Sequence, residues 1–145
     1  MAKLGASAGW SGNYCEDLTA TKSLAPSDSG KVFFLNATTE FTTTLPSVAD
    51  AGAGWNCKFI VKAAPSGAAY VVTEKTSADT NIVITNGINE LEVDTDDDGP
   101  SNTGHTTITF ADGVAIAGDW VELLCDGTNY YATGQTKADG GITLA

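Results

Sequence analysis

The feature that most constrains the fold is residues 118–135, GDWVELLCDGTNYYATGQ. Two β-prone runs flank a short loop at residues 126–129 that contains Asp-Gly, and this arrangement is the strongest local signal for a β-hairpin. One face of the first run is apolar throughout: Val121, Leu123 and Cys125. The opposite face is also largely apolar, which predicts cover on both sides of this strand. Because an isolated hairpin is marginally stable in water, we expect other strands to complete a sandwich around it.

Strand periodicity elsewhere predicts an all-β fold. Residues 55–62 alternate between an apolar side and a side that carries two lysines, as a half-buried strand does. The apolar side consists of Trp55, Cys57, Phe59 and Val61. The 16 glycines suit turns between strands, and long runs at helical spacing are missing. A chain of 145 residues is too short for two cores, so we predict one antiparallel β-sandwich or jelly-roll-like barrel over residues 27–145.

Turn signals divide this domain into short strands. Besides the runs above, strands are expected at residues 31–36, 41–45, 70–74, 81–85, 88–93 and 106–110. The pair Asn86 and Gly87 suits a type I′ turn, which predicts a hairpin with residues 81–85 and 88–93 as its arms. Residues 47–54, SVADAGAG, are expected to be an irregular connection. The tail ends with apolar Ile142 and Leu144, which predict either a last strand or a docked segment.

Residues 1–26 are interpreted as an extended N-terminal arm. Gly, Ser and Ala dominate this segment, and apolar anchors are spaced along it at Leu4, Trp10, Tyr14 and Leu18. Disordered tails rarely carry such aromatic residues, so we expect the arm to lie in a groove of its own domain or of a partner. The alternative is an irregular first edge strand that packs on its own sheet. Since aromatic anchors dominate interface energies, Leu4, Trp10 and Tyr14 are the candidate interface residues.

The charge balance excludes two classes of partner. The chain has 18 acidic and 7 basic residues, for a net charge of −11. Nucleic acids and anionic membranes are bound through cationic side chains, so neither is an expected partner. The N-terminus lacks the apolar core of a signal peptide and no apolar run is long enough to span a membrane, which predicts synthesis in a cytoplasm.

The three cysteines do not form a metal or redox motif. Cys15, Cys57 and Cys125 lie far apart in the sequence and in no CxxC arrangement, so a zinc site is not expected. Cys57 and Cys125 fall on apolar strand faces, which predicts buried free thiols. A disulfide between these two residues is the alternative.

The sequence carries no recognised catalytic motif. Its one histidine, His105, lies in a Gly- and Thr-rich stretch, and no nucleophile elbow, P-loop or zinc-protease signature is present. We therefore expect neither enzymatic activity nor a cofactor.

One acidic segment has metal-ligand spacing. Asp94, Asp96 and Asp98 precede a glycine, as in the first half of an EF-hand loop. The position of the bidentate glutamate holds His105, and the flanking residues read as strands rather than helices. A solvated acidic loop is the favoured interpretation and no metal is predicted, with a non-helical calcium loop as the alternative.

Four segments resemble small structural proteins of tailed-bacteriophage virions. These segments are DSGKVFFLN (28–36), TTTLP (42–46), AGAGWNCKFIVK (51–62) and GDWVELLCDGTNYYATG (118–134). The resemblance implies a capsid decoration (cement) protein that binds the outer surface of a phage head and stabilises it by bridging subunits of the major capsid protein. It also implies a homo-oligomer, with a trimer favoured. The short chain has no shaft-like repeat, which favours decoration over a fibre.

The alternative function is a receptor- or glycan-binding module of a tail fibre or head appendage. Trp120, Tyr130 and Tyr131 flank one turn, and aromatic rings stack on sugars. With the acidic loop, Tyr130 or Tyr131 would form the site. Adjacent residues of a strand point to opposite faces, so we expect one of these two tyrosines in the core and the other at the rim.

Overall fold

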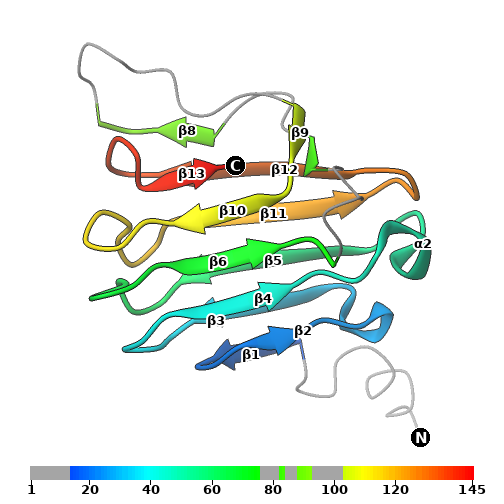
Figure 1. Cartoon of the computed structure of the whole chain (residues 1–145), viewed down its shortest axis with the longest axis horizontal. Coiled ribbons are helices and arrows are strands. Elements are labelled where there is room, and N and C mark those ends of the chain that lie inside the picture. The colour runs from blue at the N-terminus through cyan, green and yellow to red at the C-terminus, as the bar shows by residue number, and fades with distance from the viewer. Residues whose placement is uncertain (1–13, 76–81, 84–87, 93–102) are drawn as a thin grey trace, which may run out of the picture.

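Two β-sheets packed face to face make up this protein (Figure 1). The computed structural model describes residues 14–75, 82–83, 88–92 and 103–145. The larger sheet has eight strands: β1 (Cys15–Leu18), β3 (Lys31–Leu35), β5 (Asn56–Val61), β11 (Trp120–Cys125), β12 (Tyr130–Thr136), β7 (Ile82–Val83), β9 (Thr103–His105) and, also beside β12, β8 (Ile88–Glu90). The smaller sheet has five: β13 (Ile142–Leu144), β10 (Thr107–Phe110), β6 (Tyr70–Thr73), β4 (Phe41–Thr44) and β2 (Lys22–Ser23). The predicted all-β sandwich is confirmed.

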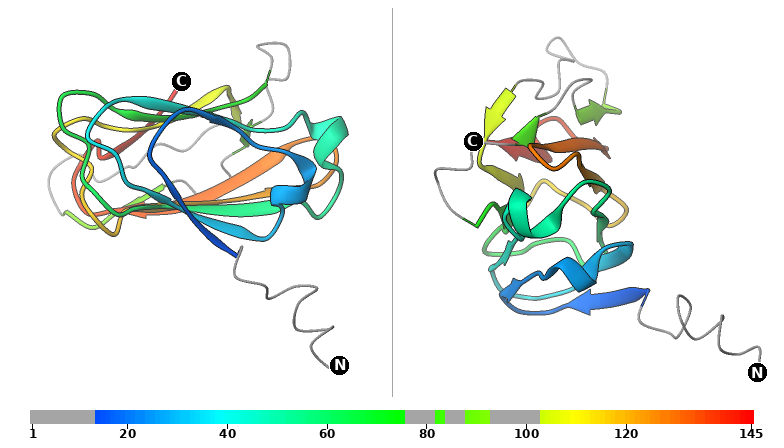
Figure 2. Two further views of the ribbon diagram at one scale, coloured as in Figure 1. Left: turned by 90° about the horizontal axis from the view of Figure 1, so that it is seen from below. Right: turned by 90° about the vertical axis from the view of Figure 1, so that its right-hand side faces the viewer.

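The sheets are mixed, in contrast to the antiparallel pairing that was expected. From β1 to β6 each successive strand belongs to the other sheet, so that β1, β3 and β5 lie behind β2, β4 and β6 (Figures 1 and 2). A chain that crosses to the opposite sheet and returns runs again in its first direction. Strands β1, β3 and β5 are therefore parallel to one another, and so are β2, β4 and β6. Antiparallel pairing holds β5, β11 and β12 together.

The predicted hairpin is present as β11 and β12, with Cys125 opposite Tyr130. In its turn the carboxylate of Asp126 accepts hydrogen bonds from the backbone N–H groups of Thr128 and Asn129, both at 2.7 Å. The expectation of cover on both sides of β11 is wrong. Its inward face is buried, whereas Glu122 is exposed and Leu124 is 50% exposed.

A second expected hairpin is not formed. Strands β7 and β8 both run parallel to β12, with Ile82 opposite Tyr130 and Ile88 opposite Gly134. Two segments that run in the same direction along one neighbour cannot be the arms of a hairpin. The Asn86–Gly87 pair itself lies outside the described residues.

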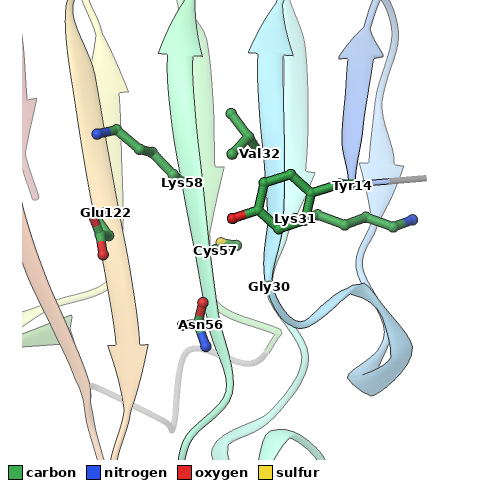
Figure 3. A pocket seen from close by; sticks show the side chains of 8 residues that line it. All are labelled: Tyr14, Gly30, Lys31, Val32, Asn56, Cys57, Lys58 and Glu122. Atoms are coloured by element: carbon green, nitrogen blue, oxygen red, sulfur yellow. The ribbon is translucent and has the colours of Figure 1, made fainter. Parts of the chain in front are cut away.

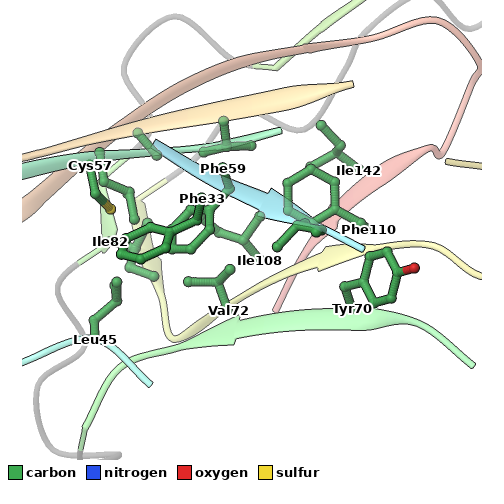
Figure 4. Close-up of a cluster of buried hydrophobic side chains, with 14 of the residues drawn as sticks. Phe33, Leu45, Cys57, Phe59, Tyr70, Val72, Ile82, Ile108, Phe110 and Ile142 are labelled. Carbon is green, nitrogen blue, oxygen red and sulfur yellow. The ribbon is translucent and has the colours of Figure 1, made fainter. Parts of the chain in front are cut away.

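The core between the sheets is aromatic and aliphatic (Figure 4). Alternation in β5 buries every second side chain, as its sequence predicts, and Phe59 stacks on Phe33 with ring centroids 5.5 Å apart. Tyr130 is 1% exposed, packs edge-on against Trp55, and donates a hydrogen bond from its hydroxyl to the Pro46 carbonyl at 2.7 Å. Burial of such large side chains contributes about 1.5–3 kcal/mol each, which fixes the register of the strands.

The connection at residues 47–54 contains one helical turn, α2 (Val48–Ala51). The Ser47 side chain caps it by accepting a hydrogen bond from the backbone N–H of Asp50 at 3.2 Å. A short 3-10 turn, η1 (Pro26–Asp28), precedes β3. No helix in the described part of the chain is long and apolar enough to cross a membrane.

Residues 14–26, the described half of the predicted arm, supply one edge strand to each sheet. Strand β1 lies beside β3 in the larger sheet, and β2 lies beside β4 in the smaller one. Leu18 and Leu24 are buried between them, with 3% and 6% of their surface exposed. This part of the chain follows the edge-strand interpretation that the sequence left open.

All three cysteines are free thiols. Cys57 and Cys125 are buried, as expected, and Cys15 is exposed. Cys57 and Cys125 belong to neighbouring strands of the same sheet, β5 and β11, so a bridge from one sheet to the other is ruled out. Burial raises the pKa of the Cys57 thiol well above its ordinary value, so it stays protonated.

Candidate interaction surface

The outer face of the larger sheet carries a cluster of apolar side chains that the second sheet does not cover. Because strands alternate their side chains, the residues between the buried ones point outward from β3, β5, β11 and β12. The cluster, here called the outer face, consists of Val32, Phe34, Ile60, Trp120, Leu124 and Tyr131. Leu124 is 50% exposed and Tyr131 is 36% exposed, and the others are half-buried. An apolar cluster of this kind on a surface is a candidate interaction site.

Strand register brings these side chains into rows across the sheet. Phe34 pairs with Ile60, and Ile60 with Trp120, so three apolar residues from three strands are adjacent. Along the next row towards the β11–β12 turn, Lys58 lies opposite Glu122. One row further on, Leu124 lies opposite Tyr131. A row that contains Lys58 and Glu122, with Val32 at its β3 end, therefore lies between two apolar rows of the outer face.

Two lysines cover aromatic rings of the outer face. The Lys58 ammonium lies 3.9 Å from the centre of the Trp120 ring, a cation–π contact. The Lys62 ammonium lies 5.9 Å from the centre of the Phe34 ring and 2.5 Å from the Asp17 carboxylate. Hydrogen bonds from Lys62 and Asn36 lower the pKa of Asp17, so this carboxylate is ionised at neutral pH.

The formal charges on the outer face cancel. Lys58 and Lys62 oppose Glu122 and Asp17, although the whole chain carries a net charge of −11. The acidic surplus therefore lies elsewhere on the molecule. Neither Lys58 nor Glu122 forms an ion pair with a described residue, although they are cross-strand neighbours.

A shallow hollow of about 100 Å³ lies at one side of this face (Figure 3). Its lining comes from the start of β1 and from β3, β5 and β11: Tyr14, Gly30, Lys31, Val32, Asn56, Cys57, Lys58 and Glu122. Tyr14 is 48% exposed, and its carbonyl accepts a hydrogen bond from the Val32 N–H at 2.8 Å. The volume is well below the range of about 300–1,000 Å³ that holds a typical small-molecule ligand, so this face suits a flat macromolecular contact better.

A second hollow, of about 270 Å³, lies at the end of the sandwich beside α2. Its lining is mainly apolar, including Leu24, Pro26, Leu45 and Pro46. The charged groups at its rim, Lys75 and Asp50, already pair with each other at 3.0 Å and are both exposed.

The edge of the sandwich at β1 and β2 is closed by a network of charges. Glu16 of β1 pairs with Lys22 of β2, so this ion pair spans the two sheets. Lys31 lies 3.3 Å from Glu16 and 2.6 Å from Asp28. Inward-pointing charges at an edge oppose the addition of another strand, so this edge is a poor template for a partner strand.

The pKa values in this network follow from these contacts. The hydrogen bond from Lys22, together with Lys31, lowers the pKa of Glu16 below its ordinary value. For Asp28, burial alone would raise the pKa, but hydrogen bonds from Lys31 and from the Ala25 N–H outweigh it and lower the pKa. The hydrogen bond to Asp28 in turn raises the pKa of Lys31. All three groups are therefore charged at neutral pH.

The predicted site residues have different positions. Of the three interface candidates, Tyr14 is exposed beside the outer face, and Leu4 and Trp10 lie outside the described residues. Of the two tyrosines in the glycan-binding hypothesis, Tyr130 is in the core and Tyr131 is at the surface, which confirms the predicted split.

The candidate metal and catalytic residues gain no further support. Asp94, Asp96 and Asp98 also lie outside the described residues. Within the described ranges, no three His, Cys, Asp or Glu side chains gather into a group that could hold a metal ion. His105 is half-buried in β9, and its Nε2 has no hydrogen-bond partner among the residues that the structure describes.

The sequence did not predict that the residues of the outer face form one cluster. The alternation in residues 55–62 indicates that Lys58 and Ile60 point outward. It does not indicate that Phe34, Trp120 and Leu124 are their neighbours, because these residues come from strands distant in the sequence.

No protein-family model matches this chain, and neither does any curated protein or solved structure.

Proposed function

We propose that this chain is a structural protein of a virion, a decoration protein that binds the outer surface of a phage head. It bridges neighbouring subunits of the major capsid protein, so that the pressure of packaged DNA must break additional contacts before the shell opens. The proposal includes no enzymatic step and no cofactor.

The observation that carries the proposal is the position of Tyr14. This aromatic residue is half exposed at the entry to the edge strand β1, and residues 1–13, with Leu4 and Trp10, precede it in the sequence. The first fourteen residues thus contain three candidate anchors, and the last of them, Tyr14, is accessible at the surface. Anchors of this kind supply most of the binding energy of protein interfaces.

Each contact needs only modest strength in this role. A decoration protein meets a repeated lattice, and several weak attachments that are linked in one assembly give a much higher overall affinity. The resemblance of residues 28–36, 42–46, 51–62 and 118–134 to virion structural proteins supports the same role. A homotrimer on the threefold positions of the head is part of the proposal on that ground, and it forms only when the chain binds the head.

The test is co-sedimentation with heads of the phage or prophage that encodes the chain, prepared without it. The full-length variant Leu4→Ala/Trp10→Ala/Tyr14→Ala is expected to bind these heads at least about tenfold more weakly, because truncation of an interface anchor costs about 1–2 kcal/mol or more. Its melting temperature should stay close to that of the wild type, since Tyr14 lies outside the core. Wild-type occupancy on heads would refute the role of these three residues.

Tyr131→Ala is the matched control, because it removes an exposed aromatic residue of β12, four strands away from β1 in the larger sheet. Unchanged head binding is expected. Of the aromatic residues in the receptor- or glycan-binding alternative, Tyr131 is exposed, whereas Tyr130 is buried in the core. The third, Trp120, has the Lys58 ammonium over its ring. If the wild-type protein binds host cells rather than heads, and Tyr131→Ala abolishes that binding, the alternative replaces the proposal.

A further inference from the structure

The charges of Lys58 and Glu122 make the outer face self-complementary. Lys58 of β5 and Glu122 of β11 stand side by side in the middle of this face (Figure 3). Each lacks an ion-pair partner among the described residues, and apolar side chains lie on both sides of their row. To bury this face against an apolar partner would leave two charges without compensation, at a considerable cost in free energy. The occupant must therefore present the opposite charges in the reverse order.

A second copy of the chain meets this requirement. We propose that the outer faces of two copies pack against each other about a two-fold axis that runs parallel to the strands, between β5 and β11. Rotation about such an axis leaves each residue at the same height along the strand direction, and it places β5 of one copy opposite β11 of the other. Lys58 then faces the partner's Glu122, and Glu122 faces the partner's Lys58.

One apolar pair of the outer face matches under the same operation, whereas Leu124 faces the partner's polar Asn56. Ile60 faces the partner's Trp120, because these two residues are register neighbours of β5 and β11. A two-fold axis that crosses the strands through the Lys58–Glu122 row would instead place like charges opposite each other. Charge thus selects one of the two ways in which the sheets can be stacked. Stacked sheets of this kind pack about 10 Å apart, with their strands within about 30° of each other.

Two other occupants fit this face less well. A glycan would need open aromatic rings, and lysine ammonium groups lie over both Trp120 and Phe34. A strongly basic partner would be attracted to the acidic surplus of the chain, but the charges of this face cancel. That cancellation also allows two copies with a net charge of −11 each to approach through it. The remaining repulsion acts over distances that salt screens, about 8 Å at 0.15 M.

The size of the face sets the expected strength of the dimer. Four strands about 4.8 Å apart and six residues of about 3.4 Å rise give a footprint of about 400 Å² per copy. This is near half of the roughly 800 Å² per partner in a standard interface, so the dimer is weak and exchanges rapidly. This interface is separate from the proposed attachment to a head and does not rest on it.

Charge exchange tests the proposal with the full chain. Sedimentation velocity at 0.15 M salt and between about 10 µM and 1 mM should show the wild-type mass rising from monomer towards dimer. Lys58→Glu and Glu122→Lys each place like charges opposite each other twice in the dimer, and each should weaken association at least about tenfold. The double variant Lys58→Glu/Glu122→Lys restores opposite charges and should recover association to within about threefold of the wild type.

Two controls match the change in net charge away from the outer face. Lys75→Glu and Glu40→Lys alter exposed positions next to strands β6 and β4 of the smaller sheet and should leave association unchanged. Thermal unfolding shows whether each variant remains folded. A wild-type chain that is monomeric throughout this range overturns the proposal, and so does a double variant that stays as weak as either single one. If the single reversals instead reduce head binding by a chain that stays monomeric, the face belongs to a capsid contact and the proposal is also overturned.

Discussion

Tyr70 joins both sheets through one hydroxyl group. This residue of β6, in the smaller sheet, is 1% exposed, and its ring lies 4.7 Å from that of Phe41. The hydroxyl oxygen lies 2.6 Å from the Ala37 carbonyl and 2.9 Å from the Ala63 carbonyl, and it accepts a hydrogen bond from the Ala37 N–H. Ala37 follows β3 and Ala63 follows β5, so a side chain of one sheet holds the strand ends of the other.

We predict that Tyr70→Phe destabilises the protein by about 1–3 kcal/mol, because it leaves partly buried backbone groups without a partner and changes little else. Urea unfolding should show a lower midpoint with an unchanged slope. Tyr131→Phe removes the same hydroxyl from an exposed ring and should change the unfolding free energy by less than about 0.5 kcal/mol. Equal effects of the two substitutions would argue against the role of the Tyr70 hydroxyl.

At the scale of elements, the strands β1 and β2 show how an open edge of the sandwich is closed by charge. The ion pair of Glu16 and Lys22 connects the two sheets where no further strand continues them. Lys31 and Asp28 extend this network to β3 and η1. Charged side chains that point inward at an edge discourage pairing with a strand of another molecule. The edge at β1 and β2 is therefore protected against the addition of another strand.

This network makes stability depend on pH in the acidic range. The folded-state pKa values of Glu16 and Asp28 lie below their ordinary values of 4.5 and 3.8. A carboxylate with a lowered pKa stabilises the fold above its ordinary pKa, and this contribution is lost as the pH falls through the lowered value. We predict that the unfolding free energy decreases below about pH 5, and that Glu16→Gln makes this decrease shallower.

Urea unfolding of the wild type and of Glu16→Gln between about pH 7 and pH 3 measures this difference. Glu40→Gln is the control, since Glu40 is exposed and forms no ion pair with a described residue. Parallel curves for the wild type and Glu16→Gln would show that the network contributes nothing to acid stability.

For the molecule as a whole, the order of strands in each sheet predicts where it opens first. Strands β5 and β11 have hydrogen-bonded neighbours on both sides and lie in the middle of the larger sheet. Strands β2 and β13 are at the two edges of the smaller sheet and have one neighbour each. Local opening begins where few buried contacts hold the backbone.

Hydrogen exchange measured strand by strand should therefore be slowest for backbone amides of β5 and β11, and faster for those of β2 and β13. The inward-facing residues of β5, among them Phe59 with none of its surface exposed, give the physical reason, because their burial opposes any separation of this strand. Similar protection in all four strands would indicate that the sandwich opens only as one cooperative unit.

Several features could be predicted because they depend on neighbours along the chain. Alternation of apolar and polar residues decides which face of a strand is buried, so Phe59 and Val61 were placed in the core and Lys58 at the surface from the sequence. Two β-prone runs that are joined by a short loop containing Asp126 and Gly127 pair with each other, so the hairpin of β11 and β12 could be predicted as well. The same alternation predicted that only one of two adjacent tyrosines would be buried.

The tertiary structure alone decided which distant strands are neighbours. The sequence does not show that the chain crosses between sheets from β1 to β6, and this crossing makes the sheets mixed and places β7 and β8 along β12 rather than against each other. It also leaves Leu124 exposed, since the smaller sheet packs on the opposite side of β11. The outer face exists only through this pairing, because Phe34, Ile60 and Trp120 come from three separate parts of the chain. The alternation of apolar and polar residues along a strand indicates which of its side chains are buried. It does not indicate which distant strand lies beside it, because that pairing depends on packing that forms only in the folded molecule.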